Sequence, residues 1–483
     1  MGNIYRDLGK EFTVWFDWVL SEAEIYDYGR YPAKGMGVWL PYGFKLRKHV
    51  LSLMRELLDS TGHEEILLPL LIPETILAKE SEHVRGFEAQ VYWVTHGGLE
   101  PLDVKLALRP TSETSLTYME SLWIKSYKQL PKKYYQVVSI FRYETSATRA
   151  MLRVREVSMF KEAHTVHADF SDSERQVKEA LEIYRRFFDQ LGIPYMVSKR
   201  PEWDKFAGAI YTIAFDTLMP DGRVLQIGTV HNLGQNFTKA FEVRIQKKDQ
   251  SIDYAWQTSY GISERVIATL LGVHGDKKGL VLPFNVAPVQ IVIIPIPAGN
   301  AEMKERVVRQ ASELERLLKE VGFRAQADLR EDITPGEKFN VWDLKGAPLR
   351  LDLGPREVQG GYVTLYRRDT GQKMRVSVDE LPEKITQVGR EVNDTLRERA
   401  WKAFKSRILR TEDLEEAKNH LVEGGVVEIP WCGKPACAER VAEILGAEAL
   451  GTPLDEEVDA GSELKCPICG GRAYTYMRYA RKY

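Results

Sequence analysis

Cysteine is scarce in this sequence: only four occur among 483 residues, and all of them lie within the last 52. Four thiols are a poor disulfide framework for a chain of this length. They form two pairs, Cys432-x4-Cys437 and Cys466-x2-Cys469, and the glycines of CPICGG let the chain curl around an ion. Four thiolates fill the tetrahedral shell of Zn²⁺ and leave no open position, so the pattern predicts a structural zinc site. Buried cysteines without a metal are the alternative, but they would not explain the clustering.

An excess of one charge and a long apolar run are also absent. Lys+Arg number 67 against 69 Asp+Glu, so a nucleic acid would have to be held by local basic patches and not by a global field. The most apolar run, ILLPLLIP at 66–73, is interrupted by two prolines and is far shorter than the roughly 20 residues of a membrane span. The N-terminal MGNIYRDLGKEF shows no targeting segment. We therefore expect a protein without a membrane span, located in the cytoplasm.

The chain is too long for one hydrophobic core and should divide into about three domains. A helical pattern at FKLRKHVLSLMRELLDSTG (44–62) precedes a strand, EILLPLL, and strand-like runs outnumber helices as far as residue 283. This predicts an α+β domain at 1–283 with a large antiparallel sheet and flanking helices. After the linker LPFNVAP, a buried strand, a helix and a hairpin predict an α/β domain at 284–400. The cysteine region predicts a small α+β domain at 401–483.

Charged residues interrupt two apolar stretches of the first domain. In SIFRYETS (139–146), strand alternation places Arg142 and Glu144 on one face, and a cross-strand ion pair on a solvated face is the simplest explanation of these eight residues alone. In RPTSE (109–113), Thr111 and Glu113 could simply form the start of a helix.

Three further strings combine histidine, glutamate and arginine with strand or helix patterns. Alternation in MLRVREVSMFKEAHTVHADF (151–170) aligns Glu162 with His164, although a lone histidine is more often structural than catalytic. The string LQIGTVHNLGQNF (225–237) gathers polar residues near two glycines. WQTSYGISERVIATLLG (256–272) places Arg265 at the start of a helix.

Together these strings resemble the class II aminoacyl-tRNA synthetases, and within them the prolyl-tRNA synthetase family of the archaeal and eukaryotic type. Residues 44–69, with Pro69 as marker, resemble class II motif 1, which implies a homodimer interface. FRYE resembles motif 2, and GISERVIATLLG resembles motif 3, with its glycine-rich lead-in reduced to Gly261. The likeness extends over essentially the whole chain through the strings RPTSE, KEAHTVHADF, TVHNLGQNF, VHGDKKGLVLPFNVAP and PGEKFNVWDLKGAPLRLDLGPRE.

The resemblance implies a reaction in which ATP and L-proline form prolyl-adenylate and pyrophosphate, after which proline passes to the 3′ end of tRNA(Pro). Arg142 would hold the α-phosphate and the substrate carboxylate, and Glu144 would lie near the adenine and the tRNA terminus. Arg265 would contact the γ-phosphate, and Arg153 would reach the phosphates from another side, with Mg²⁺ bridging them. Gln226, Thr229 and Ser263 would contact the nucleotide.

For the amino acid, the resemblance implies that Thr111 and Glu113 accept hydrogen bonds from the imino group and that His231 contacts the carbonyl side. Glu162 and His164 would complete the polar rim. Three aromatic residues, Phe160, Phe206 and Trp256, are candidate walls for the ring, and a place in the core is about as probable for them.

An apolar substrate ring and the lack of room for an editing insertion together predict that the protein makes errors in selecting its amino acid. One methylene is worth only about 1 to 3 kcal/mol, so a pocket that recognises an apolar ring by size should also activate some alanine or cysteine. About 40 residues separate KEAHTVHA from DKFAGA, which leaves no room for the editing insertion of bacterial-type relatives. Proofreading by this chain should therefore be absent.

The α/β domain resembles the anticodon-binding domain of the family. Asp343 and Arg350 match positions that contact anticodon guanines, and Lys345 lies nearby, although a surface ion pair is the simpler meaning of these charges. Many family members carry glutamate at this position. Aspartate is the shorter side chain, so the carboxylate of Asp343 reaches less far towards the anticodon. The basic helix that follows could touch phosphates or could only form a solvated face; its cations are Arg397, Arg399, Lys402, Lys405, Arg407 and Arg410.

The chain ends in AYTYMRYARKY, and the resemblance implies that the carboxylate of Tyr483 folds back towards the active site. A frayed terminus is the general expectation.

A rival interpretation is a synthetase-like binding protein that has lost catalysis, but Arg142, Glu144 and Arg265 are all present. Threonyl, seryl, glycyl and histidyl enzymes share the motif framework. A threonyl enzyme would place zinc ligands in its catalytic cleft, whereas every cysteine here lies past residue 430.

Overall fold

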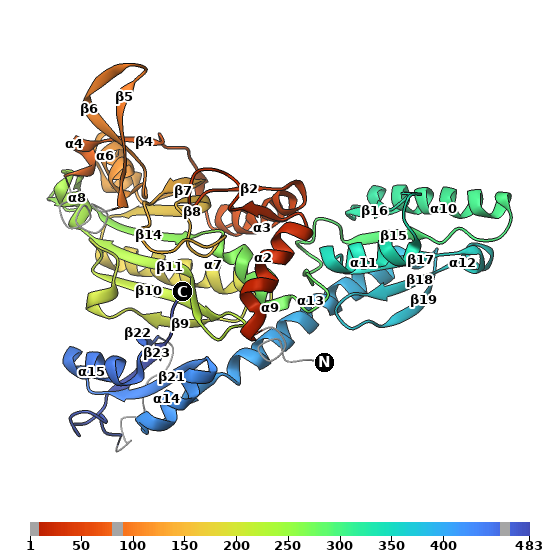
Figure 1. Cartoon of the computed structure of the whole chain (residues 1–483). Helices are drawn as coiled ribbons and strands as arrows, with labels where there is room; N and C mark the ends of the chain where they lie inside the picture. Colours follow the sequence, from red (N-terminus) through yellow and green to blue (C-terminus); the bar gives the residue numbers. More distant parts are fainter. Residues whose placement is uncertain (1–8, 80–89, 455–463) are drawn as a thin grey trace.

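The computed structural model of the chain describes residues 9–79, 90–454 and 464–483 (Figure 1). The first eight residues of the stretch in which the sequence shows no targeting segment therefore lie outside the described residues. Within the described ranges, no helix has both the length and the apolar character needed to cross a membrane. The cytoplasmic location stays a prediction.

The largest element is an eleven-stranded sheet with the order β20-β21-β23-β22-β9-β10-β11-β14-β8-β7-β3. Its strands from β9 to β7 pair antiparallel, which confirms the predicted antiparallel sheet. These strands span Met196–Lys199 (β9), Tyr211–Leu218 (β10), Val224–Gly234 (β11), Trp256–Ile262 (β14), Glu156–His167 (β8), Lys132–Phe141 (β7) and Glu64–Glu65 (β3).

One face of this sheet is covered by α7 (Phe170–Gln190), which contacts β8, β11 and β14 and also the helix α3 (Pro41–Asp59). The helix begins at the cap Asp169, whose side chain accepts a hydrogen bond from the Asp172 amide. Its buried residues Val177, Leu181, Tyr184 and Phe188 recur at helical spacing. Because α7 occupies this face, a cleft for a ligand must lie on the opposite face or at a strand end.

Smaller elements surround this sheet. A three-stranded sheet has the order β4-β6-β5, and its β5–β6 hairpin projects away from the large sheet (Figure 1). The helix α9 (Arg265–His274) follows β14 directly. The remaining elements of this region are α2 (Phe12–Glu22), β1 (Tyr26–Tyr28), β2 (Gly37–Trp39), β4 (Leu71–Pro73), α4 (Glu74–Leu77), β5 (Tyr92–Gly97), β6 (Glu100–Leu108), α6 (Glu113–Trp123), α8 (Asn236–Ala240), β12 (Arg244–Gln246) and β13 (Ile252–Tyr254).

Two predicted strands are shorter than expected. The strand predicted at 65–71 is reduced to Glu64–Glu65, because at Leu68 the backbone bonds to side chains: Gln136 accepts the Leu68 N–H, and Arg109 donates to the Leu68 carbonyl. Leu71 belongs to the separate strand β4. The strand through SIFRYETS ends at Phe141, so Arg142 and Glu144 lie in the loop beyond it and not on a strand face. The loop position frees both side chains from the alternation of the sheet.

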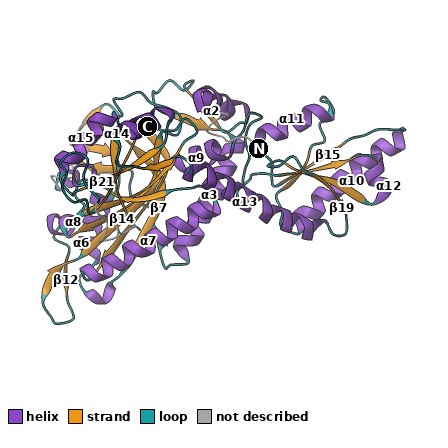
Figure 2. Cartoon of the chain, turned by 90° about the horizontal axis from the view of Figure 1, so that it is seen from below, coloured by secondary structure: helices purple, strands orange, loops and turns teal. Residues whose placement is uncertain are grey.

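A second, five-stranded sheet with the order β16-β15-β17-β18-β19 stands apart from the first (Figure 2). The helix α13 runs from this part to the C-terminal region (Figure 1) and continues through the predicted boundary at residue 400. The elements are β15 (Ile291–Pro295), α10 (Ala301–Glu320), β16 (Ala325–Ala327), α11 (Pro335–Lys345), β17 (Leu349–Leu353), α12 (Pro355–Gly360), β18 (Tyr362–Arg367), β19 (Lys373–Ser377) and α13 (Leu381–Lys405).

The C-terminal region extends the main sheet, because β22 pairs with β9. The two backbones approach so closely that a Cβ at Gly451 would lie 2.1 Å from the Lys199 carbonyl oxygen, so only glycine fits there. This pairing brings the chain terminus towards the centre of the main sheet. The elements are β20 (Ile408–Arg410), α14 (Leu414–Glu423), β21 (Val426–Trp431), α15 (Pro435–Leu445), β22 (Glu448–Pro453) and β23 (Thr475–Ala480).

Candidate active site

A cavity of about 280 Å³ lies on the sheet face opposite α7. Lys161 of β8 contacts Tyr184 of α7, so its neighbours Glu162 and Phe160 point to the other face, into the cavity. The cavity brings together every residue predicted to contact proline or nucleotide: Thr111, Glu113, Arg142, Glu144, Arg153, Glu162, His164, Gln226, Thr229, His231, Ser263 and Arg265. Of the three candidate ring walls, Phe160 and Phe206 line it, whereas Trp256 packs against Phe170 with ring centroids 5.2 Å apart.

Glu162 is a hydrogen-bonding hub at the floor of this cavity. Its Oε1 accepts hydrogen bonds from Ser112 Oγ at 2.5 Å and from Gln136 Nε2 at 2.7 Å. Its Oε2 accepts from the Ser112 amide, and Thr111 Oγ1 lies 3.1 Å away. Burial opposes the charge, but these donors and His164 outweigh it and hold the pKa of Glu162 well below its ordinary value. The carboxylate therefore fixes the turn before α6 and leaves little capacity for a ligand.

The turn held by Glu162 presents a second carboxylate, Glu113, at the first residue of α6. The two acidic side chains flank His164, whose Nε2 lies 3.4 Å from Glu162 and whose Nδ1 lies 4.0 Å from Glu113. Burial lowers the pKa of His164, but the contact with Glu162 and the charges of nearby carboxylates raise it overall. Thr111 Oγ1 donates to Glu113 Oε2 at 2.5 Å. The result is an acidic, hydrogen-bonded corner that suits a cationic amine.

Three arginines face the cavity from separate segments. Burial, together with the charges of Arg142 and Arg153, lowers the pKa of Arg265 to about 10, so both of these cations oppose the charge of Arg265. Arg142 Nε donates to the Pro110 carbonyl at 3.2 Å, and Arg265 Nε donates to the Leu152 carbonyl at 2.9 Å. A polyanion with several phosphate groups would relieve this repulsion.

Gln226 and Thr229 both line the cavity although they stand three residues apart on one strand. Strict alternation would place them on opposite faces, but β11 bulges at Ile227, where Phe215 pairs with Gly228 and the next residue, Asp216, pairs with Gln226. The Gln226 amide oxygen accepts from Arg200, which is itself paired with Asp216. Gly228, the residue beside the bulge, is the local signal for it, because a glycine inside a strand pattern often marks a bulge.

His231 contributes a neutral imidazole. Burial lowers its pKa to about 3, so the ring carries no charge at neutral pH. Its Nδ1 lies 2.8 Å from Thr212 Oγ1, which already accepts a hydrogen bond from the Phe206 amide. A hydroxyl that accepts from Phe206 and donates to Nδ1 satisfies all three groups and makes Nε2 the donor of the ring. The Phe206 ring packs on the imidazole with centroids 4.6 Å apart.

The C-terminal residue reaches the same site. A carboxylate oxygen of Tyr483 accepts a hydrogen bond from Arg153 Nη2 at 2.9 Å, and the Tyr483 hydroxyl donates to Asp221 at 2.5 Å. The Tyr483 amide donates to the Val224 carbonyl at the start of β11. The terminus is therefore pinned to a cavity residue and is not frayed.

The three residues predicted to read the anticodon lie where the five-stranded part meets the large sheet. Arg350 is stacked between Phe339 and Tyr366, with its guanidinium carbon 3.8 and 4.1 Å from the two ring centroids. Its Nε donates to Asp352 at 2.7 Å, and its Nη1 lies 3.7 Å from Asp343. Lys345 pairs with Glu24 of the large domain at 2.6 Å.

The basic helix predicted at 395–410 ends at Lys405, and Arg410 lies in β20. This segment uses much of its charge within the protein. Arg397 pairs with Asp394, Arg399 donates to the His274 carbonyl, and Arg410 pairs with Glu428. These contacts account for three of its cations without any phosphate.

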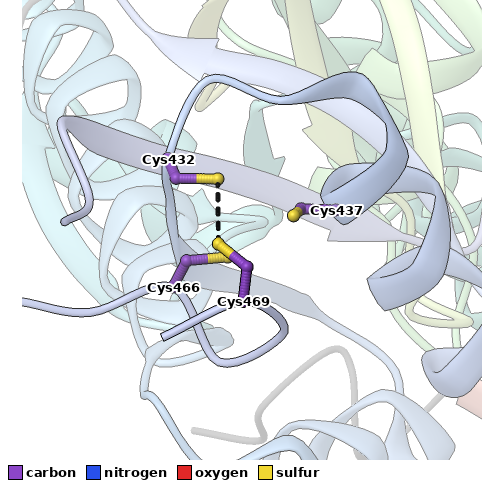
Figure 3. Close-up of side chains that lie close together, drawn as sticks. All are labelled: Cys432, Cys437, Cys466 and Cys469. Atoms are coloured by element: carbon purple, nitrogen blue, oxygen red, sulfur yellow. Dashed lines mark hydrogen bonds between the residues drawn. The ribbon is translucent and has the colours of Figure 1, made fainter. Parts of the chain in front are cut away.

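The four cysteines converge in the C-terminal region, from β21, α15 and the loop before β23 (Figure 3). All four sulfur atoms lie within 4.8 Å of one another, and the Sγ atoms of Cys432 and Cys469 are 3.7 Å apart. Tetrahedral zinc with bonds of about 2.3 Å places its sulfur ligands about 3.8 Å apart. The donor set and the spacing therefore fit a structural Zn²⁺; the four residues are Cys432, Cys437, Cys466 and Cys469.

Several supporting residues were missed at the level of sequence. Gln136 stands opposite Glu162 in the pairing of β7 with β8, and its amide bridges Glu162 to Ser112. Ser259 and Asp204 also line the cavity. Ser112 belongs to the RPTSE string, but its link to Glu162 depends on a contact 50 residues away in the chain.

Comparison with known proteins agrees with this geometry. Three family models match successive parts of the chain: the class II core domain of G, H, P, S and T tRNA synthetases at 92–274, an anticodon-binding domain at 290–388, and the prolyl-tRNA synthetase C-terminal domain at 414–483. The proline–tRNA ligase of Aeropyrum pernix is 58% identical over 98% of both chains. That of Ignicoccus hospitalis is 57% identical over 99% of this chain and 100% of its own.

A solved structure shows the same arrangement of the whole chain. The prolyl-tRNA synthetase of Giardia lamblia, in complex with prolyl-adenylate, superposes with a TM-score of 0.94 at 36% identity and covers 98% of both chains. Similarity of this extent in sequence and structure establishes that the chain belongs to the prolyl-tRNA synthetase family of class II aminoacyl-tRNA synthetases.

Proposed function

We propose that the chain activates L-proline with ATP, forming prolyl-adenylate and pyrophosphate, and then transfers proline to the 3′ end of tRNA(Pro). The observation that carries this proposal is the convergence of three arginines and the acidic corner at Glu113 on one cavity. A triphosphate satisfies the cations, and a protonated secondary amine satisfies the carboxylate. The prolyl-adenylate bound to the Giardia lamblia relative joins the proline amine to a nucleotide that keeps one of the three phosphates.

In this proposal, the proline carboxylate attacks the α-phosphorus in line as the bond to pyrophosphate breaks. Arg142 neutralises charge at the carboxylate and the α-phosphate, while Arg153 and Arg265 hold the other phosphates. Catalysis of this kind is mostly positioning and electrostatics, with no protein nucleophile. Mg²⁺ accompanies ATP as a counter-ion of the phosphates. Glu144, Gln226, Thr229 and Ser263 contact the nucleotide.

The acidic corner selects proline. Thr111 and Glu113 receive the imino group, and the neutral His231 donates to the carbonyl side. The carboxylate of Glu162 already accepts hydrogen bonds from Ser112 and Gln136. We therefore assign Glu162 and His164 to positioning the acidic corner. Phe160 and Phe206 enclose the ring. Such a pocket excludes larger rings by size and admits some alanine or cysteine.

Proofreading in cis is absent in this proposal. From His167 to Glu202 the chain forms only α7, β9 and short connections, so the segment that could hold an insertion is filled by sheet and helix.

The tRNA and a second copy of the chain complete the proposal. Asp343, Lys345 and Arg350 contact the anticodon. Arg350 Nη1 lies 3.7 Å from Asp343, so these two side chains form one polar surface. A homodimer forms through the motif 1 region, where the edge strand β3 is followed by Leu67, which is 80% exposed, and by the exposed Leu70 and Leu71.

ATP–pyrophosphate exchange with each of the twenty amino acids tests the proposed activity. Proline should drive the fastest exchange, and alanine and cysteine should give weak exchange above background. Glu113→Gln should slow proline-dependent exchange by roughly 10²- to 10³-fold, the usual effect of losing one charged contact to the reacting substrate. Exchange driven best by another amino acid would overturn the specificity, and no exchange at all would favour the binding-protein alternative.

Elemental analysis tests the cysteine cluster, which we propose holds one Zn²⁺ per chain. Cys466→Ser should lose the metal and unfold the C-terminal cluster at a lower temperature, because metal binding and folding are linked at such sites. Four thiols that react at once with a thiol reagent in the native protein, without release of zinc, would contradict the assignment.

The C-terminal residue is tested by deletion. Removing Tyr483 takes the terminal carboxylate away from Arg153, so exchange should slow about tenfold, as when a transition-state contact is misplaced. Tyr483→Phe keeps the main chain and loses only the bond to Asp221, so it should be nearly as active as the wild type. Unchanged kinetics of the deletion variant would show that the terminus has no part in adenylation.

A further inference from the structure

The string VHGDKKGL at 273–280 has no place in the proposed chemistry, yet it joins two domains. Its Asp276 accepts two hydrogen bonds from Arg368, from Nη1 and from Nη2, both at 2.7 Å. The Arg368 side chain is only 3% exposed. The Asp276 side chain is 44% exposed, so the pair joins a buried guanidinium to a carboxylate at the surface. A fork-to-fork pair fixes orientation as well as contact.

The same arginine holds the end of the helix that carries Asp343 and Lys345, two of the three predicted anticodon residues. Arg368 Nε donates to the carbonyl of Asp343 at 2.9 Å. The next two carbonyls of α11 accept from the large domain and its linker: Leu344 from the Leu280 amide and Lys345 from the Tyr42 hydroxyl. The last turn of α11 is thus capped by Arg368 of its own domain and by two groups from outside that domain.

Asp276 stands just beyond the C-terminus of α9, the helix that begins with Arg265. Between the helix and Asp276, Gly275 lies under the Trp15 ring, where a Cβ would come within 2.4 Å of a ring atom. Trp15 Nε1 donates to the Asp276 carbonyl at 2.9 Å. A helix of ten residues is about 15 Å long and moves as a rod, so a shift at this end is felt at Arg265.

We propose that Asp276 and Arg368 are positioning residues that couple anticodon recognition at Asp343 and Arg350 to the placement of α9 and Arg265. The proposal rests on the proposed function, because it takes Asp343 and Arg350 as the anticodon contacts. A guanine that engages them acts on the last turn of α11, and Arg368 passes the displacement to Asp276 through two hydrogen bonds. The coupling is measured as the difference in kcat/KM for charging two tRNAs that differ only in the anticodon.

The test compares charging of tRNA(Pro) with that of the same tRNA whose anticodon guanines are replaced. In Asp276→Asn and Arg368→Gln, the ratio of the two kcat/KM values should fall about tenfold, within the range typical of coupled sites. The loss should appear in kcat for the native tRNA, while ATP–pyrophosphate exchange without tRNA stays unchanged. Adding Arg368→Gln to Asp343→Ala should lower charging no further than Asp343→Ala alone.

Arg367→Gln is the matched control. Arg367 is the adjacent residue, is similarly buried, and pairs with Asp369 and Glu391 inside its own domain. Its variant should keep the anticodon ratio.

Two results would overturn the coupling alone: an unchanged ratio in Asp276→Asn and Arg368→Gln, or a parallel loss of exchange, which would mean that the pair only holds α9 in place. A wild-type protein that charges both tRNAs equally would instead overturn the anticodon assignment, and the coupling with it.

Discussion

The site depends on three guanidinium groups that are held together against their mutual repulsion. Arg142 and Arg265 donate to the backbone carbonyls of Pro110 and Leu152, and Arg153 donates to the C-terminal carboxylate of Tyr483. These oxygens fix the direction of each guanidinium group. The carboxylates of Glu113, Glu144 and Glu162 line the same cavity and act on Arg142, so the site holds buried charges of both signs, each of them costly.

Other parts of the fold position the oxygen atoms that contact these arginines and form a separate acidic corner. Pro110 belongs to the turn that Glu162 fixes through Ser112, so one hub orients both an arginine and the carboxylate of Glu113. The Tyr483 carboxylate comes from the far end of the chain and reaches the cavity because β22 extends the main sheet. The C-terminal region thereby contributes a residue directly to the site.

Much of this arrangement is predictable from local patterns. Period-two alternation correctly places Glu162 and His164 on one face of β8, and the spacing of the cysteines predicts their cluster. The resemblance to a known family selects residues that the structure gathers in one cavity. Whether each of them plays the role expected of it stays a prediction.

What the sequence could not predict depends on contacts between distant segments. The bulge at Ile227, which puts Gln226 beside Thr229, arises from the pairing of β11 with β10. Gln136 is recognisable as a partner of Glu162 only from strand register, and the bond between Arg153 and Tyr483 spans 330 positions of the chain. The early end of β7 at Phe141 likewise reflects the turn of the chain into the cavity.

The most direct test of the central claim is the melting temperature of Arg265→Gln with and without ATP. If the three cations repel one another until a triphosphate binds, the ligand-free variant should unfold within about 1 kcal/mol of the wild type, because relief of repulsion offsets the lost hydrogen bonds. Stabilisation by saturating ATP, about 2.7 kcal/mol at a hundredfold excess over Kd in the wild type, should largely disappear. A variant that is strongly destabilised without ligand yet fully stabilised by ATP would contradict the account.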